Sequence, residues 1–220
     1  MKNINYCEPC NTQNRVRRIN VLGKELDVKG YICSADGVNY PQKPVDIQLQ
    51  LSVSPTSFCP AECPFCIAKG TKSVNKIDLV KFEKVMCRLK TENVVRGVKI
   101  TGGEPFGDIA LLDETITILF DIFGFDLELA ISTNGMGLDK LHRIKYLKYL
   151  ETIHISRHHY NDEINRKIFN AAVPDTAKLK DVISSVPYKD IFVINCMLLR
   201  DYINSTEEAH CFLDYGIIII

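Results

Sequence analysis

The segment Cys59-Pro60-Ala61-Glu62-Cys63-Pro64-Phe65-Cys66 places three cysteines at CxxxCxxC spacing. A proline follows each of the first two cysteines, and an aromatic residue precedes the third. Proline fixes its own φ angle and keeps the preceding residue out of helical geometry, so we expect an irregular loop that directs the sulfurs toward one place. Three such thiolates are suited to three irons of a four-iron cluster, which would leave the fourth iron open to a small molecule.

The same cysteines also allow a zinc interpretation. Zinc binds thiolate pairs such as Cys63 and Cys66, and the chain has nine cysteines in 220 residues. Disulfides are less favoured, because no feature of the chain indicates an oxidising compartment. Cys87 and Cys196 lie on apolar segments and are expected in the core.

A second motif follows about forty residues later: Thr101-Gly102-Gly103-Glu104-Pro105, directly after the apolar segment 98–100. Glycines let the backbone approach a ligand closely, and a glutamate accepts strong hydrogen bonds from an ammonium group. Alone, this motif is typical of an ordinary turn. In this order and spacing, the two motifs resemble those of the radical S-adenosylmethionine (SAM) superfamily, and the resemblance extends from Asp46 to the last residue.

The resemblance implies a cofactor site with assigned residues. Cys59, Cys63 and Cys66 would hold a [4Fe-4S] cluster, and Phe65 would pack beside it and offer its backbone to the adenine of SAM. The segment Gly102, Gly103 and Glu104 would bind the amino group of SAM. The implied activity is reductive cleavage of SAM to a 5′-deoxyadenosyl radical that abstracts hydrogen from a substrate.

Periodicity predicts an α/β fold from residue 46 onward. Apolar residues alternate with polar ones, or run together, in segments expected to be strands, and helical spacing separates these segments. Such alternation favours a parallel sheet with helices outside, and the resemblance implies a partial (β/α)6 barrel, like an incomplete TIM barrel. The expected strands are 46–53, 97–101, 127–132, 152–156, 191–196 and 217–220, and the expected helices are 79–89, 109–123, 138–147, 175–186 and 206–215, the last capped by Gly216.

Residues 1–45 form a separate N-terminal extension in this interpretation, with 46–220 as the core domain ending in strand six. Segments 15–21 and 25–33 flank Gly23 and predict a short β-hairpin. Cys7 and Cys10 form a CxxC pair that, with Cys33, offers at most three ligands locally. Zinc sites usually need four, so surface thiols are slightly favoured over a second metal site.

Further polar residues stand where expected strands end, which is where barrels of this kind place their active sites. Thr133 and Asn134 are candidates for the ribose or carboxylate of SAM, although Asn-Gly also suits a plain turn. The resemblance assigns Ser156 to SAM contact. Arg157 is a candidate for the SAM carboxylate. The remaining candidates are Asn195, for a ligand or a core hydrogen bond, and His158 with His159, for substrate or as a polar loop.

Composition excludes some classes of protein. Lys plus Arg and Asp plus Glu are 27 each, so net charge gives no signal for nucleic acid or an anionic membrane. The N-terminus lacks an apolar signal core, and no run is long enough for a membrane span. We expect a cytoplasmic protein, where cysteines stay reduced.

The substrate is not identified by the sequence. The closest similarity is to the molybdenum-cofactor GTP-cyclase-like and peptide-modifying branches of the superfamily, so the substrate is a small molecule or a peptide. A glycyl-radical activase is less favoured, because activases usually lack such an N-terminal extension. The family implies an electron donor such as flavodoxin or ferredoxin. The alternative function is a non-catalytic zinc- or iron–sulfur-binding module that acts through a protein partner.

Overall fold

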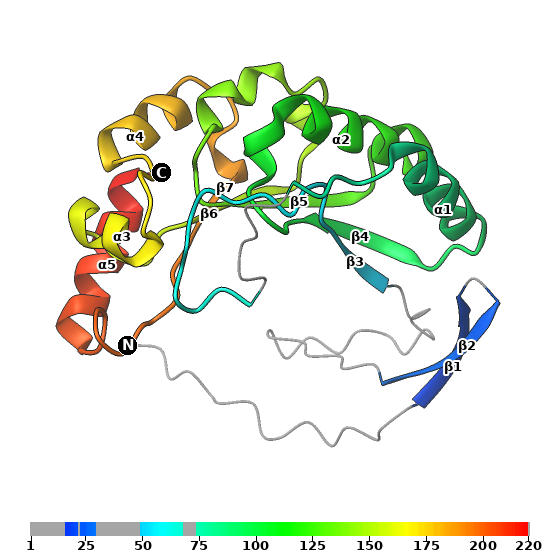
Figure 1. Cartoon of the computed structure of the whole chain (residues 1–220), viewed down its shortest axis with the longest axis horizontal. Helices are drawn as coiled ribbons and strands as arrows, with labels where there is room; N and C mark the ends of the chain where they lie inside the picture. The colour runs from blue at the N-terminus through cyan, green and yellow to red at the C-terminus, as the bar shows by residue number, and fades with distance from the viewer. Residues whose placement is uncertain (1–15, 22, 30–48, 68–73, 220) are drawn as a thin grey trace, which may run out of the picture.

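A five-stranded parallel sheet organises the chain. The computed structural model describes residues 16–21, 23–29, 49–67 and 74–219, and the sheet has the order β3-β4-β5-β6-β7. Each strand pairs with the next along the chain, and the sheet is open and curved (Figure 1). This confirms the predicted α/β partial barrel. The strands are β3 (Leu49–Val53), β4 (Val95–Ile100), β5 (Glu128–Thr133), β6 (Thr152–Ser156) and β7 (Phe192–Asn195).

The N-terminal extension contains the expected hairpin. Strands β1 (Val16–Val21) and β2 (Lys24–Lys29) pair antiparallel around Gly23, whose φ is +82°. Such a φ suits glycine, because it has no Cβ to clash. The CxxC pair of Cys7 and Cys10 lies outside the described residues, as does Cys33, so their role stays a prediction.

Helices cover one face of the sheet. In Figure 1, α1 (Leu79–Thr91), α2 (Ile109–Phe123) and α4 (Thr176–Ser184) lie along its convex side. As expected, Asp175 caps α4, its carboxylate accepting the Lys178 N–H at 2.9 Å. The core between sheet and helices is built from alternate strand residues and one side of each helix. In the part of the chain that the structure describes, no helix has both the length and the hydropathy needed to cross a membrane.

The expected helix over 138–147 is wrong. The chain instead forms two 3₁₀ helices, η2 (Leu138–Arg143) and η3 (Leu147–Tyr149), separated by extended backbone at Ile144. A 3₁₀ helix has three residues per turn, so apolar residues at every third position share one side. That spacing is present here and resembles α-helical spacing over a short stretch. The buried residues at this spacing are Leu138, Leu141, Ile144, Leu147 and Leu150.

The expected sixth strand is also wrong. Helix α5 (Thr206–Ile219) continues through Gly216, so Ile217–Ile219 is helical. The apolar run at its end favours a strand locally, but α5 buries Phe212, Tyr215 and Ile219, which have helical spacing. Burial of that side therefore overrides local propensity.

One further helix, α3 (Asp162–Phe169), was not expected. Asn161 caps it by accepting the Glu163 and Ile164 N–H groups at 3.0 and 3.1 Å. Two acidic residues follow the cap, in the turn where the helix dipole favours negative charge. This start signal is present in the sequence, and the helix escaped prediction because it is only eight residues long.

Candidate functional site

The two sequence motifs are joined by backbone hydrogen bonds. The cysteine loop, residues 54–66, leaves the carboxyl end of β3 and runs beside the segment that follows β4. The Gly103 N–H donates to the Thr56 carbonyl at 3.0 Å, and the Glu104 N–H donates to the Phe58 carbonyl at 2.7 Å. The segment after β4 therefore holds the loop that carries the cysteines.

Both glycines are needed for this contact. A Cβ on Gly103 would lie 2.0 Å from the Phe58 carbonyl oxygen, and a Cβ on Gly102 would lie 1.8 Å from the Ser54 Oγ. Gly102 also has a φ of +111°, which side chains other than glycine rarely adopt. The close approach predicted for these glycines is thus made to the cysteine loop within the protein.

Gly103→Ala is expected to destabilise the protein by about 3 kcal/mol, because the Phe58 backbone must move away. The measurement is denaturant unfolding of the apoprotein. Gly107→Ala is the matched control, since its nearest neighbour would be the Phe58 ring at 3.6 Å, an ordinary contact. Equal stability of the two variants would contradict the close contact at Gly103.

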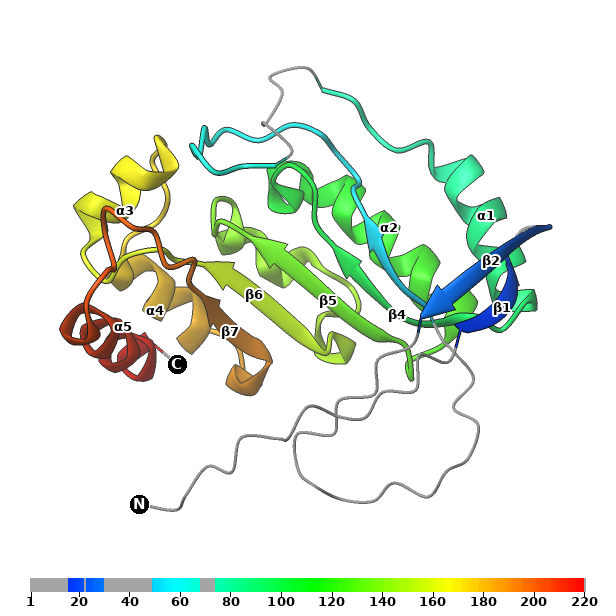
Figure 2. The ribbon, with the colours of Figure 1, turned by 90° about the horizontal axis from the view of Figure 1, so that it is seen from below.

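Helix α3 holds the other side of the cysteine loop. The Glu62 N–H donates to the Phe169 carbonyl at 2.9 Å, and the Asn170 side chain donates to the Glu62 carboxylate at 3.1 Å. Figure 2 shows the bend of the loop beside α3. A small apolar cluster fills the contact; it consists of Ala61, Phe169 and Val173, with Cys59, Cys63, Met136 and Ala171 at its border.

The three thiols lie close enough to influence one another. Each is half-buried. Burial raises the pKa of the Cys59 thiol, and the nearby Glu104 and Cys66 raise it further. Burial, with the charges of Cys59 and Cys66, raises the pKa of Cys63 to about 11. A cation at this place would favour the thiolates, so binding would release protons.

The donor set of the loop is three thiols. A four-iron cluster takes one thiolate per iron, so the three cysteines could hold three of its irons. Among the described residues, no group of three or more His, Cys, Asp and Glu side chains is arranged to hold a metal ion.

Glu104 lies in the protein interior, between the ends of β4 and β5. Its side chain is 1% exposed. The carboxylate accepts the Phe106 N–H at 3.1 Å, the Thr133 hydroxyl at 2.6 Å and the Asn134 N–H at 2.7 Å. Burial raises the pKa of Glu104 to about 7, although these three hydrogen bonds lower it in part. Glu104 therefore links the two strand ends as well as standing in the predicted site.

Thr133 and Asn134 connect Glu104 to the cysteines. Besides donating to Glu104, the Thr133 hydroxyl accepts the Gly135 N–H at 2.9 Å. The Asn134 side chain donates to the Cys59 sulfur at 3.8 Å. The structure thus brings together the predicted residues of three strand ends.

Arg157 is placed elsewhere. Its guanidinium is 1% exposed, forms an ion pair with Asp162 and donates to the Pro174 carbonyl at 2.7 Å. It also lies 5.5 Å from the Tyr215 ring centre. These partners tie the end of β6 to α3, to the segment before α4 and to α5, so the guanidinium is engaged within the protein. The free guanidinium fork assumed from the sequence is occupied within the protein.

Ser156 and Asn195 lie on the concave face of the sheet. They pair in register on β6 and β7, opposite in direction to the buried Ile155. The Asn195 side chain contacts His154 Nδ1 at 3.1 Å, which accounts for its polar group in a strand. Further concave-face residues, at alternate positions of the strands, are Ser52, Lys99, Ser132, Thr152 and His154.

The sequence analysis did not identify this row of polar residues on the concave face. Its signal is present in the sequence, because Lys99 stands between the apolar residues Val98 and Ile100. In the structure these two side chains are fully buried and Lys99 is half-exposed. Lys99 forms no ion pair with any residue that the structure describes. The concave face therefore offers the positively charged Lys99 and several hydrogen-bonding groups. They lie on the strands, below the edge from which the cysteine loop leaves the sheet.

Phe65, His158 and His159 lie near the carboxyl ends of the strands. Phe65 contacts His158, with ring centres 5.0 Å apart. His158 and His159 are 6% and 3% exposed, so they are not the solvated polar loop that was one alternative. His159 packs on Tyr160 with ring centres 4.3 Å apart and accepts the Asn161 N–H at 2.9 Å.

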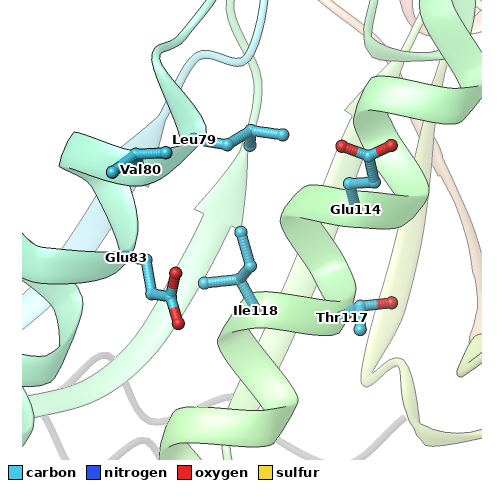
Figure 3. A pocket seen from close by; sticks show the side chains of 6 residues that line it. All are labelled: Leu79, Val80, Glu83, Glu114, Thr117 and Ile118. Atoms are coloured by element: carbon cyan, nitrogen blue, oxygen red, sulfur yellow. The ribbon is translucent and has the colours of Figure 1, made fainter.

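Two cavities lie outside this cluster of residues. One, of about 450 Å³, is lined by the loop after β5 and the connection from α3 to α4, and shares Met136 and Val173 with the apolar cluster beside the cysteines. The other, of about 320 Å³, lies between α1 and α2, with Glu83 and Glu114 at its rim (Figure 3). Its lining comes only from those two helices, on the side of the sheet opposite the concave face.

Comparisons with known proteins agree with this geometry. The family model described as "Radical SAM superfamily" matches residues 53–210. The GTP 3',8-cyclase of Aliarcobacter butzleri is 32% identical over 178 residues, covering 75% of this chain and 54% of that protein. A probable GTP 3',8-cyclase of Thermococcus kodakarensis is 28% identical over 119 residues, covering 54% and 38%. The chain thus spans about half or less of the curated relatives' length.

Solved structures share the fold. Streptococcus suis SuiB, determined with bound S-adenosylmethionine, has a TM-score of 0.60 at 18% identity, covering 79% of this chain and 39% of that one. Native anSMEcpe with bound AdoMet has a TM-score of 0.53 at 17% identity, covering 75% and 48%.

Proposed function

The chain belongs to the radical SAM superfamily of enzymes, and we propose that it binds a [4Fe-4S] cluster through Cys59, Cys63 and Cys66 and uses it to cleave SAM. Proteins of this superfamily bind SAM and carry such a cluster. When bound, the reduced cluster supplies one electron that splits SAM into methionine and a 5′-deoxyadenosyl radical. The observation that carries the proposal is the pair of hydrogen bonds from Gly103 and Glu104 to the cysteine loop.

The protein's own residues would orient SAM at the strand ends. Glu104 uses three acceptor positions within the protein, and its Oε2 has capacity for one more hydrogen bond. We assign that position to the ammonium group of SAM. Thr133 and Ser156 are proposed to contact the remainder of SAM, and the Phe65 backbone its adenine.

The apolar cluster beside the thiols supports this site. Ala61, Phe169 and Val173 are nearly fully buried and exclude water from one side of the cysteines. Exclusion of water strengthens electrostatic interactions and limits side reactions of a radical. We propose a cytoplasmic location with a flavodoxin- or ferredoxin-type electron donor, because the thiols must stay reduced.

Anaerobic reconstitution with iron and sulfide tests the proposal. The expected result is one four-iron cluster per chain, and formation of 5′-deoxyadenosine from SAM after reduction with dithionite. Recovery of zinc alone, with no iron retained and no SAM cleavage, would instead support the zinc-binding module.

GTP is the first substrate to test, because the curated relatives are GTP 3',8-cyclases. Lys99 on the concave face is the proposed partner for an anionic group of the substrate. Lys99→Met is expected to weaken GTP binding about tenfold or more, the effect of losing one charge-assisted hydrogen bond, while SAM cleavage without substrate is retained. Isothermal titration measures the binding, and Lys84→Met on α1 is the control. Absence of GTP binding by the parent protein would exclude GTP.

A further inference from the structure

His158 lies between two aromatic rings from distant parts of the chain. Its ring stacks on Phe169 of α3, with centres 4.9 Å apart and planes 19° apart. The Phe65 ring of the cysteine loop meets it edge to face, with centres 5.0 Å apart and planes at 85°. Aromatic pairs of this geometry stabilise a protein by more than the burial of their surface area alone.

Hydrogen bonds hold the His158 ring and backbone in place. Its Nδ1 accepts the Met197 N–H, from the segment after β7, at 3.1 Å. Because a backbone N–H can only donate, Nδ1 must be the unprotonated nitrogen and Nε2 carries the proton. The His158 N–H donates to the Asn165 side chain of α3 at 2.9 Å. Burial, with the nearby Arg157, lowers the pKa of His158 to about 4, in agreement with a neutral ring.

The ring therefore joins three segments beside the thiols. One is the cysteine loop, through Phe65 directly before Cys66. The second is α3, whose Phe169 carbonyl also accepts the Glu62 N–H of the same loop. The third is the segment after β7. The loop is thus held on the α3 side by two contacts that converge on Phe169.

We propose that His158 is a positioning residue: its ring fixes Phe65, and with it the third cysteine, in the place required for cluster binding. The proposal depends on the proposed function only where it states that the third cysteine binds a cluster. The loop's order can be measured in the apoprotein, without the cluster.

Two substitutions separate the ring from its hydrogen bond. His158→Asn keeps an acceptor near the Nδ1 position but removes the ring, whereas His158→Phe keeps the ring and removes the acceptor. We expect the Glu62 and Cys66 amides, which donate to the Phe169 and Cys63 carbonyls, to exchange hydrogen about tenfold faster in the His158→Asn apoprotein than in the parent, because the loop opens more often. In His158→Phe they should stay closer to the parent. His159→Asn is the matched control, because no ring contact joins His159 to the cysteine loop among the described residues.

Cluster uptake is the second measurement. Under identical anaerobic reconstitution, His158→Asn should retain less than about half of the parent's iron, and His158→Phe more than His158→Asn. Parent-like exchange and iron content in His158→Asn would overturn the proposal. A parent that takes up no iron would overturn the proposed function, while the exchange result would still decide the role of His158.

Phe65→Leu covers the case in which His158→Asn does not fold, and it allows a double-mutant cycle where both variants fold. Phe65 is half-buried on a loop, so Phe65→Leu should fold and should speed exchange of the same amides. If both variants fold, the double variant should exchange no faster than the more affected single variant, because the two substitutions remove one shared contact. Parent-like exchange in Phe65→Leu, or fully additive effects, would overturn the proposal.

Discussion

Replacement of Cys63 by Ala is expected to abolish cluster binding, leaving less than about a tenth of the parent's iron after anaerobic reconstitution. Each thiolate binds one iron, so the two that remain hold a four-iron cluster poorly. Cys59→Ala and Cys66→Ala should behave alike. Iron analysis and the broad visible absorbance of the cluster measure the effect.

The matched control is Cys87→Ala. The sequence placed Cys87 in the core, which is wrong, because it is exposed on α1. Its replacement should leave iron content unchanged. Retention of full iron in all three loop variants would remove the cluster assignment.

Cys7→Ala combined with Cys10→Ala is also expected to leave this cluster intact.

Glu104→Ala is expected to lower the free energy of unfolding by about 3 kcal/mol or more. The carboxylate is 1% exposed and satisfies three donors, on Phe106, Thr133 and Asn134. Its removal leaves those donors buried without a partner and opens a cavity. Denaturant unfolding of the apoprotein measures the loss. Stability equal to that of the parent would show that these hydrogen bonds are replaced by water.

The pH dependence of stability provides a second test of Glu104. Burial raises its pKa from 4.5 to about 7 in the folded protein, so between these values the folded state keeps a proton that the unfolded state releases. Its contribution to stability is therefore largest below pH 4.5 and falls as pH rises to 7, by on the order of 3 kcal/mol. Glu104→Gln cannot titrate and should lack this slope.

The surface residue Glu114 gives the control for that comparison. Glu114→Gln, at the rim of the cavity in Figure 3, should keep the pH dependence of stability that the parent shows.

Glu104→Gln should also bind SAM about tenfold more weakly, because a charged hydrogen bond to the ammonium is lost. Parent-like SAM affinity would leave Glu104 with its structural role alone.

Much of the fold was predictable because it depends on local periodicity. The alternation of strands and helices, the hairpin around Gly23 and the Asp175 cap each follow from a few neighbouring residues. Errors arose where two periodicities look alike over a short stretch. Apolar residues at every third position from Leu138 formed 3₁₀ helices, and the run at Ile217 joined α5 because its helical face is buried.

The sequence by itself determined the loop of three cysteines, the glycines that follow β4 and the order in which they occur, because proline and glycine restrict or free the backbone locally. Only the tertiary structure decided where the polar side chains point. Buried polar groups must find partners, and those partners come from distant segments. Arg157 therefore pairs with Asp162, Glu104 accepts from the end of β5, and His158 joins α3 to the cysteine loop.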